Sequence, residues 1–308
     1  MAPISLTRDL MAAGFTSNEV ARQVRSGTLS PLRRGAYLRA VDVELSPAAR
    51  HLRLVEATMP LVAAGSVVSH LSAAVVHGLP VFADQLDHVQ LTRDDVAGGK
   101  RRGRLHLHAA PLDPTEVVVI NGITTTSMAR TVVDVARSIA FDRAVVVGDA
   151  ALRQTLDTTA LADSVGRAAG RPGVAQARRV CGFLDPRSES PGESLSRVVL
   201  HEAGIPAPTP QYSVYGRGGR LAGRADFGWE EQRTLGEFDG RTKYGRLLKP
   251  GESTEDVLYR EKLREDALRD LGWQVVRWTW ADLRHPATIA DRLLRAFQRS
   301  ARAQSEPG

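Results

Sequence analysis

Three acidic side chains lie close together in the stretch ADFGWEEQRTLGEFDGRTKY, which spans residues 225–244. The pattern predicts a β-hairpin with EEQR at its turn, so that Asp226 lies directly opposite Glu237 and Asp239 follows on the same face. Directly opposed carboxylates destabilise a sheet, in which a cross-strand pair contributes roughly 0.2 to 1 kcal/mol. Mg²⁺ prefers carboxylate and water oxygen atoms as ligands and would remove that repulsion. Asp226 and Glu237 are therefore the predicted metal ligands.

A magnesium ion held by these carboxylates could generate hydroxide from water and neutralise the charge that builds up on a phosphodiester during hydrolysis. Asp239 would assist at the strand end, and Glu193 from an earlier helix would complete the acidic cluster. Both have simpler alternatives. Glu193 ends the sequence SPGE, a capping-box pattern that satisfies the backbone at a helix start. Asp239 would lie opposite Arg224 as a cross-strand ion pair, and its D-G sequence is common in turns.

The hairpin belongs to a segment that follows DPRSESPGES, a break rich in serine, proline and glycine that predicts a domain boundary at about residue 186. Beyond it, the patterns predict a helix (190–204), strands (211–215, 220–229 and 233–239), a helix (253–271), a strand (273–279) and a last helix (286–300). The predicted order is α-β-β-β-α-β with an extra helix.

This order, with an acid on the second strand and E-x-[acid or Lys] on the third, resembles the PD-(D/E)XK restriction-endonuclease-like superfamily. The phrases GRADFGW, LGEFDGRTKY and EKLREDALRDLGWQVVRWTWADL are similar to its very-short-patch-repair-like branch, over residues 188 to 285. The resemblance implies hydrolysis of DNA. Asp239 stands where the superfamily has a lysine, and Lys243 or Lys262 could supply that charge instead. The alternative is a binding module without turnover, because fold does not settle function.

Arginines of the first 40 residues form a second candidate site, with six arginines against two acids in a chain whose net charge is +6. We expect a helix over 4–13 that stops at Gly14, and a second helix that a Thr16–Glu19 capping box opens and Gly27 ends. Two short strands around an R-R-G turn would follow as a wing. The predicted DNA-contacting residues are Ser17, Asn18, Arg22 and Arg25 on the second helix and Arg33 and Arg34 in the wing. The alternative is a helical cap with solvated arginines.

Residues 46–185 alternate helix and strand patterns, and two features there could bind ligands. The basic loop GGKRRGR could touch phosphate, but a solvated hairpin loop is the simpler interpretation. His106 and His108 share a strand face at the spacing of some metal pairs. With no third ligand in the sequence nearby, they are interpreted as ordinary strand histidines.

The front of the chain carries its own resemblance. LMAAGFTSNEVARQVRSGTLSPLRRGAYL, SVVSHLSAAVVHGLP and GITTTSMARTVVDVARSIAFDRAVVVGDAALR are similar, over residues 4–185, to the AbiEi-type antitoxin and transcriptional-regulator family. The resemblance implies operator DNA binding and a cognate nucleotidyltransferase-like toxin as partner. So few residues precede the first helix that a full winged helix is not expected, which predicts weak autonomous DNA binding.

The sequence predicts an α/β (α+β multidomain) protein with a short winged-helix-like segment (1–45), a mixed α/β middle domain (46–185) and a restriction-endonuclease-like domain (186–308). No apolar run approaches the ~20 residues of a membrane span, and no signal peptide is recognised, so a cytoplasmic protein with no membrane partner is expected. The lone cysteine, Cys181, excludes an internal disulfide. We expect a DNA-binding regulator or antitoxin; the alternatives are a magnesium-dependent DNA endonuclease and a purely protein-binding antitoxin.

Overall fold

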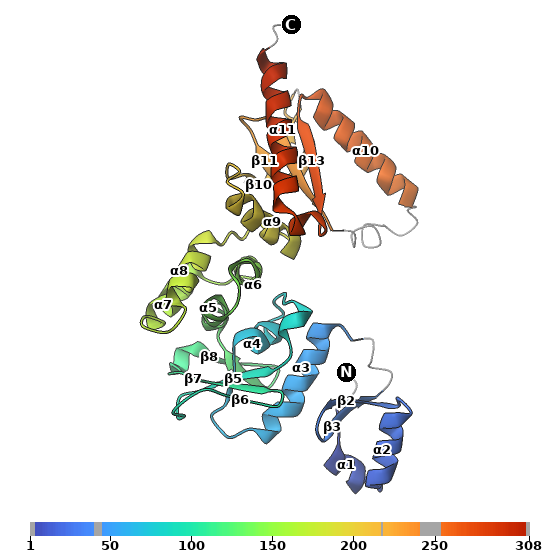
Figure 1. Cartoon of the computed structure of the whole chain (residues 1–308), viewed down its shortest axis with the longest axis vertical. Helices are drawn as coiled ribbons and strands as arrows, with labels where there is room; N and C mark the ends of the chain where they lie inside the picture. The colour runs from blue at the N-terminus through green and yellow to red at the C-terminus, as the bar shows by residue number, and fades with distance from the viewer. Residues whose placement is uncertain (1–3, 40–44, 217, 241–253, 306–308) are drawn as a thin grey trace. The chain divides into compact units, whose positions relative to one another are not determined.

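The computed structural model describes residues 4–39, 45–216, 218–240 and 254–305. The chain forms two compact units, Met1–Leu184 and Asp185–Gly308. Each unit combines helices with β-sheet, so the predicted mixed α/β class with several parts is confirmed (Figure 1). The expected segments 1–45 and 46–185 together correspond to unit 1, which ends at Leu184. Among the described helices, none has the length and apolar character needed to cross a membrane.

Unit 1 begins with a small sheet backed by two helices. Its elements are β1 (Ser5–Leu6), α1 (Thr7–Ala12), α2 (Ser17–Arg25), β2 (Leu29–Arg33) and β3 (Ala36–Arg39). The antiparallel strands lie in the order β1-β3-β2. The helix expected over 4–13 is shorter than predicted, because Ser5 and Leu6 pair with β3. The N–H of Thr7 donates to Gly35 O at 2.9 Å, so the helix begins only there.

A six-stranded mixed sheet follows, in the order β6-β7-β5-β4-β9-β8. Its strands are β4 (Val67–Val68), β5 (Val89–Arg93), β6 (Lys100–Arg102), β7 (Leu105–Ala109), β8 (Val117–Ile120) and β9 (Ile123–Thr126). The helices are α3 (Pro47–Thr58), α4 (His70–Val76), α5 (Met128–Ser138), α6 (Phe141–Arg153), α7 (Thr158–Arg167) and α8 (Val174–Phe183). Leu32 and Leu38 of the small sheet join Leu54 of α3 and Leu91 of β5 in one buried cluster, so the two parts of unit 1 share a core.

A buried charge network attaches α5 to the start of β8. The Arg130 side chain is 1% exposed and donates from Nη1 to Glu116 and from Nε to Asp134, both at 2.7 Å. Arg167 of α7 donates to the second oxygen of Glu116 at 3.0 Å. Buried charges persist only when they are paired in this way.

Unit 2 is a four-stranded sheet with helices on both faces. Its elements are α9 (Pro191–Glu202), β10 (Thr209–Tyr215), β11 (Leu221–Trp229), β12 (Thr234–Asp239), α10 (Thr254–Asp270), β13 (Gln274–Thr279) and α11 (Pro286–Ser305), which is the predicted order. The strands lie in the order β10-β11-β12-β13, with β13 parallel to β12 after the α10 crossover. Leu200 of α9 and Leu293 of α11 pack on one face of the sheet. Leu268 of α10 packs on the other face.

Candidate functional site

The acidic hairpin adopts the predicted register. Phe227 pairs with Gly236 and Trp229 with Thr234, and the same register sets Asp226 against Glu237 as the next position. The paired ladder ends at Phe227, and there the Asp226 side chain accepts a hydrogen bond from the backbone N–H of Phe238 at 2.7 Å. This carboxylate therefore stabilises the hairpin itself, which is a role that the sequence did not predict.

Glu237 is neutralised by two arginines from outside the hairpin. Arg264 of α10 donates from Nη2 to Oε1 at 2.6 Å, and Arg277 of β13 donates from Nε to Oε2 at 2.8 Å. The Glu237 side chain is only 12% exposed, so screening of these two ion pairs by water is limited. The two guanidinium groups offset the charge repulsion between the carboxylates, which is the role that the sequence pattern predicts for a metal ion.

Glu193 is buried at the start of α9, and donors occupy both of its carboxylate oxygens. Oε2 accepts from Glu189 N at 2.8 Å and from Gln211 Nε2 at 2.7 Å, while Oε1 accepts from Ser190 Oγ at 2.7 Å. Ser190 Oγ in turn accepts from the N–H of Glu193. These contacts match the capping alternative, extended by a side chain of β10.

Among the described residues, Asp239 and Lys262 are the other positions with a predicted role in the nuclease-like site. Asp239 lies half-buried at the end of β12, opposite Thr279 of β13. The cross-strand ion pair proposed for it is not seen among the described residues, since Arg224 forms a bidentate pair with Glu189 at 3.0 Å. Lys262 is exposed on α10. Lys243 lies outside the described residues.

In this arrangement, protein donors already engage the carboxylate oxygens of Glu237 and Glu193. Arginines hold both oxygens of Glu237, and helix-start donors hold those of Glu193. Across the described ranges, no three His, Cys, Asp or Glu side chains form a group that could hold a metal ion. Mg²⁺ binding by Asp226 and Glu237 stays a prediction.

The N-terminal candidate site presents one polar face of α2 to solvent. The predicted capping box opens the helix: Thr16 Oγ1 accepts from Glu19 N at 3.3 Å, and Glu19 Oε2 accepts from Thr16 N at 2.8 Å. These bonds lower the pKa of the Glu19 carboxyl, because the backbone N–H of Thr16 favours its ionised form. Val20 is the buried residue of this helix, which packs against β2. The exposed residues are Ser17, Asn18, Ala21, Arg22 and Arg25.

The wing places two arginines at the tip of a tight turn. Arg33 pairs with Ala36 across the turn, and Gly35 has φ +81°, a conformation that favours glycine. Arg34 is exposed and Arg33 half-buried. The structure therefore places the four helical residues on one face of α2 and the two arginines at a hairpin turn, and DNA contact by these residues stays a prediction.

Sequence reasoning missed Arg264 and Arg277, the partners of Glu237. One signal was present for Arg277, because aligning the apolar residues of β12 and β13 in parallel sets it beside Glu237. No local signal identifies Arg264, whose position depends on how α10 packs.

The comparisons with known proteins give relatives without a stated activity. No protein-family model matches the chain. Two uncharacterized proteins of Mycobacterium tuberculosis, Rv2248 of strain H37Rv and MT2308 of strain CDC 1551, are each 33% identical to it over 183 residues. The match covers 59% of this chain and 64% of the length of each relative. The crystal structure of the RV2827C protein from M. tuberculosis is similar at 15% identity, with a TM-score of 0.38, over 69% of this chain and 83% of that one.

Proposed function

We propose that this chain is a DNA-binding transcriptional regulator or antitoxin, of the AbiEi type that its sequence resembles. The observation that carries the proposal is the exposed face of α2, which presents hydroxyl, amide and guanidinium groups at helical spacing. A helix held against a small sheet with such a face outward is the arrangement that reads a DNA major groove.

Chemical differences along that face support separate roles. Ser17 and Asn18 lie at the helix N-terminus, where the side chains of a recognition helix reach base edges. Arg22 and Arg25 lie in its last turn and suit phosphate contacts. Arg34, exposed in the wing, would contact the backbone beside the groove. The partner implied by the resemblance, a nucleotidyltransferase-like toxin, belongs to the same proposal.

The test is fluorescence anisotropy of the full chain on duplex DNA from the region upstream of its own coding sequence, over a range of salt concentrations. Changing both Arg22 and Arg25 to alanine should weaken binding and reduce the slope of log K against log salt by about 2, one for each lost phosphate contact. Asn18→Ala should reduce discrimination between this DNA and a scrambled duplex by about 1 to 3 kcal/mol.

Arg178→Ala is the matched control, because Arg178 is exposed on α8, away from the candidate face. It should leave both affinity and salt slope unchanged. Binding that is absent, or that does not respond to salt, would overturn the proposal and favour an antitoxin that binds protein alone.

A magnesium-dependent DNA endonuclease is the second candidate, favoured by the α-β-β-β-α-β order and by Asp226 and Glu237 on adjacent strands. Plasmid incubated with the protein and Mg²⁺ or Mn²⁺ should be nicked, whereas Asp226→Asn should abolish nicking. Absence of nicking with either metal would exclude this candidate. The arginine pairs on Glu237 are the reason to rank it second.

A further inference from the structure

A cavity of about 650 Å³ lies in unit 1 between two basic hairpin turns. The wing contributes Arg33 and Arg34, and the turn between β6 and β7 contributes Arg102 and Arg104. Gly103, with φ +56°, forms the second turn and lets the two arginines flank it. The GGKRRGR loop thus faces the wing, although some 70 residues separate them in sequence.

The charge of these four arginines is not balanced within the cavity lining. None of the cavity-lining residues is acidic, and within the described ranges no ion pair joins any of the four to a carboxylate. Arginines of unit 2 contrast with them, since Arg292 pairs with Asp282 and Arg295 with Asp291. Guanidinium groups gathered without counter-charge create a positive potential that attracts anions, most strongly in a concave site.

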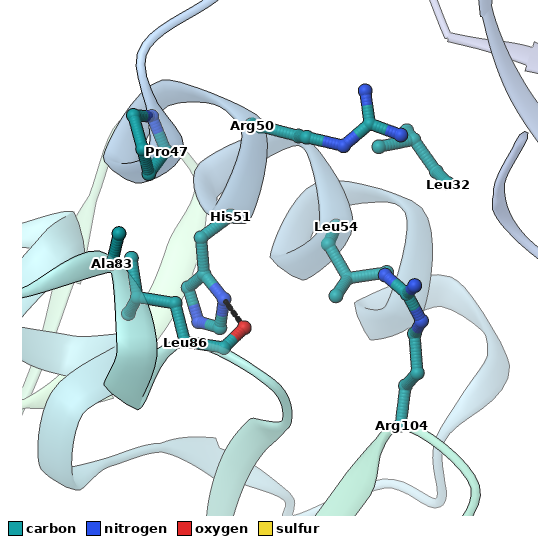
Figure 2. A pocket seen from close by; sticks show the side chains of 8 residues that line it. All are labelled: Leu32, Pro47, Arg50, His51, Leu54, Ala83, Leu86 and Arg104. Carbon is teal, nitrogen blue, oxygen red and sulfur yellow. Dashed lines mark hydrogen bonds between the residues drawn. The ribbon is translucent and has the colours of Figure 1, made fainter. Parts of the chain in front are cut away.

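Part of the cavity lining is apolar. Leu61, Val62 and Leu105 form it, and Leu61 is 57% exposed, which is high for a large aliphatic side chain. Arg104 also lines a smaller neighbouring hollow of about 150 Å³, where its side chain reaches toward Leu54 of α3 (Figure 2). The guanidinium of Arg104 therefore lies beside the helix that leads into the apolar part of the lining.

A ligand for this cavity needs several negative charges and an apolar part. Guanidinium groups bind phosphate oxygens in a bidentate manner, and four of them suit more than one phosphate. The volume falls within the roughly 300 to 1,000 Å³ typical of small-ligand sites. A duplex backbone would engage the arginines but leave the apolar part of the lining uncovered.

We propose that this cavity binds a small phosphorylated ligand with a heterocyclic part, of the nucleoside polyphosphate class. The phosphates contact the four arginines, and the base packs on Leu61, Val62 and Leu105. Arg33 and Arg34 are shared with the predicted DNA-contacting residues, whereas Arg102 and Arg104 are not, so the inference can be tested independently of the proposed function.

Isothermal titration calorimetry of the full chain with ATP, GTP and tripolyphosphate tests the proposal. Both nucleotides should bind, and the double variant Arg102→Ala/Arg104→Ala should bind them more than about tenfold more weakly, as expected for loss of charge-assisted hydrogen bonds. Leu61→Ser should weaken nucleotide binding but leave tripolyphosphate binding unchanged. Arg178→Ala serves as the control that keeps full affinity, and circular dichroism verifies that each variant is folded.

Three outcomes overturn the proposal. The first is no binding of either nucleotide, and the second is equal nucleotide affinity in the double variant and the unmodified chain. The third is a double variant that loses affinity only for duplex DNA, which would assign the β6–β7 turn to the DNA interface. Arg22→Ala should retain nucleotide binding, so a failure of the DNA proposal leaves this inference standing.

Discussion

His51 makes unit 1 sensitive to acid, because its hydrogen bonds require an uncharged ring. The side chain is buried on α3, with Nδ1 at 3.1 Å from Leu86 O (Figure 2) and Nε2 at 2.8 Å from Ser72 Oγ. Leu86 O can only accept, so Nδ1 carries the proton of the neutral ring, and Nε2 accepts from Ser72 Oγ, which itself accepts from Gln90 N. The ring then donates only from Nδ1, and protonating Nε2 would break the bond from Ser72.

Burial lowers the pKa of His51 from 6.5 to about 4, against the smaller opposing effect of the hydrogen bond to Leu86. Between these two pH values the unfolded chain binds a proton that the folded chain does not. The contribution of His51 to the free energy of unfolding is therefore complete above pH 6.5. It falls by about 1.4 kcal/mol per pH unit as the pH drops below that value. The total loss at pH 4 is about 3 kcal/mol for this one residue. Burial lowers the pKa of His70 to about 4 as well, which adds a similar loss.

Urea unfolding at pH 7.5 and pH 5 measures this effect. All four tryptophans, at positions 229, 273, 278 and 280, belong to unit 2, so tryptophan fluorescence follows unit 2 and far-UV circular dichroism follows both units. We expect the unit 1 transition to lose about 2 kcal/mol per histidine at pH 5, which is 1.5 units below the ordinary histidine pKa of about 6.5.

His51→Gln removes the titrating ring and should reduce the pH dependence of unit 1 by about one proton. His70→Asn does the same while suiting the φ of +51° at that position, which asparagine tolerates. Equal pH dependence in the unmodified chain and both variants would refute the reasoning, as would an unchanged unit 1 transition between pH 7.5 and pH 5.

Three further substitutions test the packing and charge arguments. Glu116→Ala should destabilise unit 1 by about 3 to 5 kcal/mol, because it leaves the buried Arg130 guanidinium with one carboxylate partner. Urea unfolding followed by circular dichroism measures this loss, and a loss below 1 kcal/mol would contradict the prediction. Glu237→Gln should cost unit 2 about 1 to 3 kcal/mol through its two arginine contacts; an unchanged tryptophan-fluorescence midpoint would show that the pairs contribute nothing. Gly173→Ala should lower stability by about 1 to 3 kcal/mol more than Gly170→Ala. Both glycines have positive φ, so the two substitutions share the same backbone strain. Of the two, only Gly173 would place the new Cβ against a backbone carbonyl, Arg137 O, at 2.2 Å. Equal thermal midpoints of the two glycine variants would refute the clash.

Local patterns predicted the elements whose stability is local. The register of β11 with β12 follows from alternation on each side of the EEQR turn, and Phe227 opposite Gly236 is its outcome. The capping box at Thr16 and the glycine ends of α1 and α2 are likewise set within a few residues. The strand β1 was not predicted, because two residues are too few to show a periodic pattern. These residues form a strand only through their pairing with β3.

Contacts between distant segments could not be predicted in the same way. The carboxylate face of the hairpin follows from the sequence, but its counter-ions come from α10 and β13. The sequence pattern of a helix does not show how that helix packs on a sheet. Similarly, the wing was predicted to contact DNA and the GGKRRGR loop was interpreted as a solvated hairpin loop, and neither pattern indicates that the two turns lie close together. Only the core shared by Leu32, Leu38 and Leu54 brings those turns to the same cavity.

The parallel pairing of β13 with β12 has a consequence for synthesis on the ribosome. Arg264 and Arg277, which neutralise Glu237, follow it by 27 and 40 residues. The acidic hairpin therefore leaves the ribosome before the arginines that neutralise Glu237 have been synthesised. Until α10 and β13 have been translated, the like charges of Asp226 and Glu237 oppose closure of the hairpin. Domains fold in the order of their emergence, so unit 1 can be complete while unit 2 still waits for the last segment of the chain.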